Sequence, residues 1–107
     1  MYIDVDSKEL VRVITEIEKR KPKGRSKKFQ QADVELYFLA GLAIFVVDTI
    51  EISTPAKGQD WRGRVLFPKI VLIPYVKNPP KGPTVRFSYE AGKVQIENFK
   101  INALHLD

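Results

Sequence analysis

The chain contains no cysteine and only one histidine, His105, among its 107 residues. Disulfides, thiolate nucleophiles and cysteine-bound metals are therefore excluded, and one chain cannot build a site with two histidine ligands. We expect His105 to be an ordinary surface residue, and we expect no metal and no other cofactor. The absence of cysteine fits a reducing compartment.

Long apolar segments are also missing. The longest, residues 42–47, is far shorter than the roughly 20 residues that cross a bilayer. No charged segment followed by an apolar one opens the sequence as a secretion signal would. We therefore expect a cytoplasmic protein without a membrane partner.

The sequence shows no catalytic signature. Its glycines fall in separate predicted turns and make no phosphate-binding loop: Gly58, Gly63, Gly82 and Gly92. Asp4 and Asp6 form a D-x-D pair, which binds divalent ions in some enzymes, but Asp6 is better placed to cap a helix. We expect no enzyme, because a small hydrolase or nuclease would need Asp4, Asp33 and Asp48 to converge in a cleft.

The length and composition indicate one globular domain covering residues 1–107. Hydrophobic residues make up 44% of the chain and charged residues 29%, which is typical of a protein with a packed core. A chain of this length has room for one such core and not for two.

Positive charge is concentrated between residues 19 and 28, whose sequence is KRKPKGRSKK. This stretch holds seven basic residues and no acidic one, so the net charge of +5 leaves about −2 for the rest. A local patch can neutralise several phosphates, which predicts nucleic-acid contact. The predicted contacts are Lys19, Arg20, Lys21, Lys23, Arg25, Lys27 and Lys28. Because Pro22, Gly24 and Ser26 interrupt the stretch, a solvated surface loop or a site for an acidic protein is the alternative.

The first third of the chain has the pattern of a strand followed by a helix. Residues 1–5 alternate in polarity, and Asp6 with Glu9 three residues later forms a capping box. The stripe that follows has helical spacing and consists of Leu10, Val13, Ile14 and Ile17. Pro22 and Gly24 should end this helix near Lys21.

Strand patterns follow. From residue 32 the apolar period is two, and residues 43–47 and 50–54 continue as two further strands, so we expect three antiparallel neighbours. We predict a polar loop at residues 55–60 and another strand at residues 61–67. Trp61 with Arg62 and Arg64 fits base stacking, or packing of the indole ring at a sheet edge.

Residues 69–77, KIVLIPYVK, fit either a short kinked helix or a strand, because Pro74 would break a hydrogen bond inside a helix. A proline-rich connector, residues 78–83, precedes the clearest hairpin in the sequence, residues 85–96. The apolar phase then changes, which predicts a bend or bulge near Asn98 before a last strand through residue 106.

This order repeats one βαβββ unit twice, and in about this length it resembles one domain of a DNA sliding clamp. The resemblance covers nearly the whole chain and is carried by three segments: MYIDVDSKELVRVITEIEKR, RGRVLFPKIVLIPYVKNPP and TVRFSYEAGKVQIENFKINALHL. It implies an α+β, DNA-clamp-like fold, two βαβββ repeats with antiparallel sheets and two helices on one face. In such clamps the domains close into a ring, and the helices line a positively charged hole.

The resemblance also implies how DNA would be held. The helices would contact the DNA backbone without reading its sequence. The first helix would offer Lys8, Arg12 and Lys19, and the second would offer Lys69, Lys77 and Lys81. We expect DNA as the partner and a homo-oligomer formed through sheet edges. The alternative is a protein-interaction module of the same fold, which binds a partner peptide at a strand edge or at residues 71–76.

Overall fold

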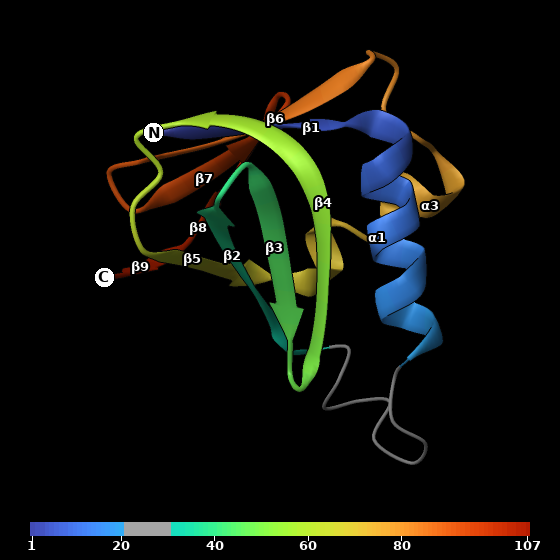
Figure 1. Cartoon of the computed structure of the whole chain (residues 1–107). Coiled ribbons are helices and arrows are strands. Elements are labelled where there is room, and N and C mark those ends of the chain that lie inside the picture. The colour runs from blue at the N-terminus through green and yellow to red at the C-terminus, as the bar shows by residue number, and fades with distance from the viewer. Residues whose placement is uncertain (21–30) are drawn as a thin grey trace.

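The structure is a computed structural model and describes residues 1–20 and 31–107 (Figure 1). In chain order its elements are β1 (Tyr2–Asp6), α1 (Ser7–Lys19), β2 (Asp33–Leu39), β3 (Leu42–Val47), β4 (Ile50–Gln59), β5 (Arg64–Pro68), the 3-10 helix η1 (Lys69–Val71), α3 (Pro74–Lys77), β6 (Thr84–Glu90), β7 (Lys93–Ile96), β8 (Phe99–Asn102) and β9 (Leu104–Leu106). The fold is therefore mixed α+β.

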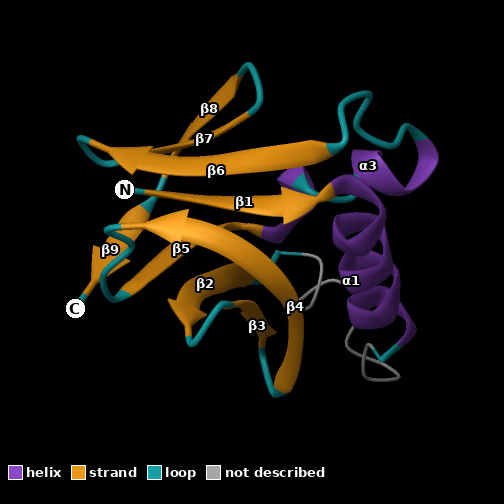
Figure 2. Cartoon of the chain, turned by 45° about the horizontal axis from the view of Figure 1, so that its top comes forward, coloured by secondary structure: helices purple, strands orange, loops and turns teal. Residues whose placement is uncertain are grey.

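The described strands form one antiparallel sheet in the order β8-β7-β6-β1-β4-β3-β2-β5-β9. The two ends of this order, β8 and β9, are separated in sequence by Ala103 alone, so the sheet curls into a nearly closed barrel. Helices α1 and α3 lie on the same side of the strands (Figures 1 and 2). The antiparallel pairing predicted for β2, β3 and β4 is confirmed.

Strand β4 belongs to both parts of the sheet. Residues 50–55 pair with β3, and residues 56–59 pair with β1. The prediction of a polar loop at residues 55–60 is therefore wrong, since the strand continues through Gln59. The error arises because β1, which is far away in sequence, supplies the partner that keeps these polar residues extended.

The last strand segment also changes partner. Strand β8 pairs with β7, and β9 pairs with β5. The Ala103 amide donates a hydrogen bond to the Gly92 carbonyl at 2.9 Å, just as the Ala56 amide donates to the Gly41 carbonyl at 2.9 Å. Each of these two strand segments is thus held by the glycine of a tight turn at the point where the segment changes its pairing partner.

Those two turns have nearly the same backbone. Ala40 and Gly41 have φ values of 52° and 79°, and Ala91 and Gly92 have 51° and 80°. Positive φ at two successive residues is the geometry of tight two-residue hairpins, which glycine adopts without strain. A turn at Glu97, with φ 55°, reverses the chain before β8, so the bend predicted near Asn98 is a full reversal.

The helical segments are anchored in a similar way. The Ser7 amide at the start of α1 donates to the Pro83 carbonyl at 2.9 Å, directly before β6. The Lys69 amide at the start of η1 donates to the Ala32 carbonyl at 3.1 Å, directly before β2. Each helical segment therefore starts against the beginning of a strand from the other half of the chain.

Helix α1 closes one side of the core. As predicted, Asp6 caps it, with its carboxylate accepting from the Glu9 amide at 3.0 Å. The predicted apolar stripe is buried and consists of Leu10, Val13, Ile14 and Ile17. Beneath it, Phe45 and Phe67 each pack on Phe87, with ring centroids 5.8 and 6.2 Å apart. Such aromatic contacts add about 1 kcal/mol each to the burial of the rings.

Of the two structures considered for residues 69–77, the helical one is confirmed. Pro74 occupies the first position of α3, where no intrahelical bond is lost. The segment is thus a 3-10 turn followed by a single α-helical turn.

Candidate nucleic-acid interface

The side of the molecule that carries α1 and α3 holds four exposed lysines, Lys8, Lys19, Lys77 and Lys81. Within the described residues none of the four makes an ion pair. Lys8 and Lys81 border one hollow, and Lys19 and Lys77 border another. Both hollows lie along α1, so the lysines are spread from its first turn to its last.

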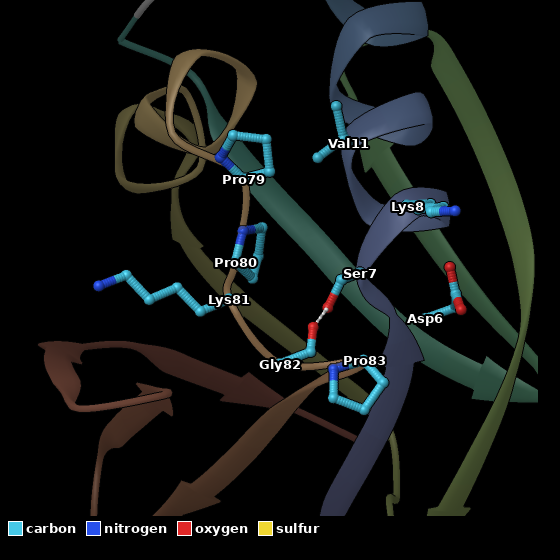
Figure 3. Close-up of a pocket in the computed structure, with 9 residues that line it drawn as sticks. All are labelled: Asp6, Ser7, Lys8, Val11, Pro79, Pro80, Lys81, Gly82 and Pro83. Atoms are coloured by element: carbon cyan, nitrogen blue, oxygen red, sulfur yellow. Dashed lines mark hydrogen bonds between the residues drawn. The ribbon is translucent and has the colours of Figure 1, made fainter.

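The first hollow lies between the start of α1 and the proline-rich connector (Figure 3). The Ser7 hydroxyl donates to the Gly82 carbonyl at 2.5 Å and holds the connector against the helix. The side chains that line the hollow include Val11, Pro79, Pro80 and Pro83. Lys8 and Lys81 extend away from each other on its two sides (Figure 3), so this hollow does not concentrate positive charge on one ligand.

Of the three arginines predicted as contacts, Arg12 and Arg20 are already paired. Arg12 contacts the Glu9 carboxylate and donates to the Ser53 carbonyl of β4 at 3.1 Å. Arg20 lies 3.8 Å from the Glu16 carboxylate. Exposed pairs of this kind are weak, about 0.3–0.5 kcal/mol, so a phosphate could still compete for both arginines. Arg12 also covers a backbone carbonyl on the edge of β4.

Contrary to the expectation from the sequence, Lys69 does not lie on the exposed surface. Its side chain is only 2% exposed, and its Nζ is 3.2 Å from the nearer carboxylate oxygen of Glu18. The 3-10 turn that follows β5 places Lys69 against α1, where its ammonium meets Glu18. Lys69 is therefore removed from the set of surface contacts and joins the two helical segments instead.

The remaining predicted contacts are Lys21, Lys23, Arg25, Lys27 and Lys28, and these five lie outside the described residues. Their charge still matters for the whole chain. The sequence has 18 basic and 13 acidic residues, so removal of these five leaves 13 of each sign. The entire net charge of +5 is thus equal to the charge of residues 21–30.

Trp61 packs in the core and is unavailable for base stacking. It is 7% exposed, and its indole N–H donates to the Leu36 carbonyl at 3.3 Å. Of the two roles considered, packing is the one observed. The neighbouring Arg64 pairs with Glu35 at 2.7 Å, while Arg62 is exposed.

His105 has a structural contact. Its Nε2 lies 2.6 Å from the Arg62 carbonyl, and its ring packs in a tilted arrangement on the ring of Tyr89, with the centroids 5.3 Å apart. It therefore holds β9 against the segment before β5.

The acidic residues are dispersed. Asp4 forms a two-bond ion pair with Arg86, at 2.8 and 2.9 Å, and Asp6 caps α1. Residues 1–20 and 31–107 contain no group of three or more His, Cys, Asp or Glu side chains that could hold a metal ion. In the same residues, no helix is long and apolar enough to span a membrane.

The second hollow, here called the α1–α3 groove, is mostly apolar. It has a volume of about 510 Å³ and is lined by Thr15, Glu18, Lys19, Ile70, Ile73, Pro74, Val76 and Lys77. Ile70 is 61% exposed and Val76 is 40% exposed. Sequence reasoning pointed to residues 71–76 but missed Ile70. The available signal was an apolar run, IVLIPYV, too long for so short a helix to bury entirely.

Comparison of the chain with protein-family models, with curated proteins and with solved structures finds no match.

Proposed function

We propose that this chain is a non-catalytic, clamp-like module that contacts the DNA backbone without reading sequence and that self-associates through its sheet edges. The observation that carries the proposal is the placement of α1 and α3 on the same side of the strands (Figure 2), with Lys8, Lys19, Lys77 and Lys81 exposed there. Phosphate contacts of this kind position a protein on DNA without specifying bases.

Matching features in the two halves support a doubled βαβββ unit. Strand β1 lies between β4 and β6, and β5 lies between β2 and β9. This is the arrangement expected if β5, β6 and β9 are the second-half counterparts of β1, β2 and β4. The paired crossover bonds to Gly41 and Gly92, and the paired anchors of Ser7 and Lys69, follow the same correspondence. A unit used twice brings its two helices to one side.

The sheet edges support self-association. Among the strands of residues 1–20 and 31–107, β8 and β9 each pair on one side only. Exposed apolar residues lie on them, with Phe99 50% exposed and Leu104 58% exposed. Edge strands with exposed apolar side chains are templates for pairing with another chain. Replacement of Phe99 and Leu104 by glutamate should abolish an oligomer seen by light scattering without unfolding the domain.

The central test is a salt titration of binding to duplex DNA of unrelated sequences. Log affinity should fall linearly with log salt, by about 0.9 for each phosphate neutralised. The variant Lys8→Gln, Lys19→Gln, Lys77→Gln and Lys81→Gln should reduce that slope by roughly 3 to 4. A second variant, with Lys23, Arg25, Lys27 and Lys28 changed to glutamine, measures how much residues 21–30 contribute to that slope.

Lys57, Lys93 and Lys100 provide the matched control, because they are exposed on the strands. Their glutamine variant should keep the wild-type slope. If the control variant and the variant of Lys8, Lys19, Lys77 and Lys81 lose the same amount of slope, the chain attracts DNA by its overall charge and has no defined interface. Undetectable or salt-insensitive DNA binding by a strictly monomeric protein would refute the proposal.

A further inference from the structure

The α1–α3 groove presents apolar side chains that the core leaves exposed. Leu72, at 1% exposure, supplies the inward contact of this segment, whereas Ile70 and Val76 lie 61% and 40% exposed. Ile70, Ile73 and Val76 recur at intervals of three residues and line the same groove. Ile73 is partly buried and packs against the core. The exposed Ile70 and Val76 on either side of it contribute little to folding, and exposed apolar side chains that lie together are a feature of interaction surfaces.

The size of the groove fits part of a helix. Its volume of about 510 Å³ is in the range of sites that enclose several apolar groups. One wall is α1, through Thr15 and Lys19, and the other is the segment from Ile70 to Lys77. An amphipathic helix seated in such a groove inserts side chains from successive turns.

The rim of the groove is basic. Lys19 and Lys77 stand at it, exposed and, within the described residues, outside any ion pair. Glu18 is the acidic residue in the lining, and the Lys69 ammonium, 3.2 Å away, offsets its charge. The groove thus combines an apolar floor with a positive rim.

This combination selects the occupant. A second copy of the chain placed here through the same surface would bring Lys19 and Lys77 against their own counterparts, and like charges oppose such a contact. Residues 21–30 of the chain are basic too, and so are not complementary. Acidic side chains beside an apolar stripe match both properties of the groove.

We propose that the α1–α3 groove binds an acidic amphipathic helix of a partner protein. Apolar residues of that helix occupy the space beside Ile70, Ile73 and Val76, and its carboxylates pair with Lys19 and Lys77. The groove shares Lys19 and Lys77 with the proposed DNA contact, but its apolar residues are separate from that contact, because a DNA duplex offers phosphates and no apolar stripe to fill the groove.

The test uses the full chain and a fluorescent synthetic peptide of about 16 residues, with leucine at i, i+3, i+4 and i+7 and glutamate at most other positions. Three control peptides separate the contributions: a scrambled one, one with lysine for glutamate, and one with serine for leucine. The peptide that carries both leucine and glutamate should bind at least tenfold more tightly than each control peptide. Backbone amide shifts should change at Thr15, Ile70 and Val76.

Variants then locate the site. Ile70→Ser with Val76→Ser should weaken peptide binding by at least tenfold and leave DNA binding and unfolding midpoint unchanged, because both residues are exposed. Leu39→Ser is the matched control, since Leu39 is also 61% exposed but lies at the end of β2. Lys19→Glu with Lys77→Glu should weaken binding of the acidic peptide and strengthen binding of the peptide that carries lysine in place of glutamate.

Several results would overturn the site. The first is equal binding of the acidic and scrambled peptides. The second is a loss of peptide binding in Leu39→Ser equal to that in Ile70→Ser with Val76→Ser. The third is a set of amide shift changes that maps to the strands. Formation of a dimer that Ile70→Ser and Val76→Ser abolish would identify a second copy as the occupant. If DNA binding fails while peptide binding passes these tests, the groove stands and the proposed DNA function falls.

Discussion

The Lys69 ammonium lies beneath α1, 3.2 Å from the Glu18 carboxylate, and forms an ion pair between the first helix and the start of the second helical segment. The two partners differ in exposure: the Lys69 side chain is 2% exposed and that of Glu18 is 31% exposed. Removing one partner of a pair costs most when the charge left behind is the buried one.

We therefore expect Glu18→Gln to destabilise the protein more than Lys69→Met. The first change weakens the compensation of a buried ammonium, with an expected cost of about 2–4 kcal/mol. The second leaves a carboxylate that water can reach, at about 1–2 kcal/mol. Urea unfolding of the two variants and of the double variant provides the measurement, and the reverse order of cost would contradict this account of the pair.

Gly63→Ala should be far more damaging than Gly41→Ala. Both glycines have positive φ, 66° and 79°, so the conformational cost of alanine is shared, at roughly 1 kcal/mol. A Cβ at Gly63 would lie 2.1 Å from the Leu106 carbonyl oxygen, whereas a Cβ at Gly41 would meet no atom of the described residues within 4 Å. Hydrogen exchange should show loss of protection at Leu104 and Leu106 in the Gly63 variant alone.

Thr54→Val should leave stability unchanged or raise it by about 1 kcal/mol. The Thr54 hydroxyl is buried and finds no hydrogen-bond partner in the described part of the chain. Valine has nearly the same shape and removes the unsatisfied polar atom. A rise in the thermal midpoint supports this reasoning, and a loss of more than about 1 kcal/mol would show that the hydroxyl has a partner, such as a buried water.

Trp61 provides an internal optical probe, because it is the sole tryptophan of the chain. Its buried indole should emit at short wavelength, resist quenching by iodide and shift to longer wavelength on unfolding. Single-stranded DNA should leave the emission unchanged, because the ring is inside the core. A DNA-induced quench at native conditions would instead indicate that Trp61 can reach the bases.

Tyr75 should titrate later than an ordinary tyrosine. Desolvation of its ring, followed by the negative charge of Glu97 and the hydrogen bond to it, raises the pKa of Tyr75 above 10.0. The folded state therefore favours the neutral phenol, so this contribution to stability is full below pH 10.0 and is lost as the pH rises through the folded pKa. Phenolate absorbance of the wild type and of Tyr75→Phe should differ by one late-titrating group.

Local patterns in the sequence predicted the first helix, its Asp6 cap and the strands with regular alternation. These features depend on residues within one or two turns of each other. The continuation of β4 through Gln59 was not predictable in this way, because the partner that extends it is β1, more than fifty residues earlier.

In the candidate site, too, some features could be predicted from the sequence and others depend on residues that are distant along the chain. The resemblance implied that Lys8, Lys19 and Lys77 lie on exposed helix faces, and all three are exposed. The burial of Lys69 depends on a 3-10 turn and on Glu18, and the hydrogen bond from Arg12 to the Ser53 carbonyl depends on the packing of α1 against β4. A lysine in a sequence does not show which neighbour will neutralise it.

The meeting of β8 and β9 at Ala103 bears on how the protein is made. Strand β5 acquires its second neighbour, and β7 acquires its outer one, only when residues 99–106 are present. During translation, earlier segments can pair as they emerge from the ribosome, but β5 and β7 lack these neighbours until this stretch is free of the exit tunnel. Nascent chains stalled before residue 99 should therefore remain sensitive to protease, and resistance should arise in one late step.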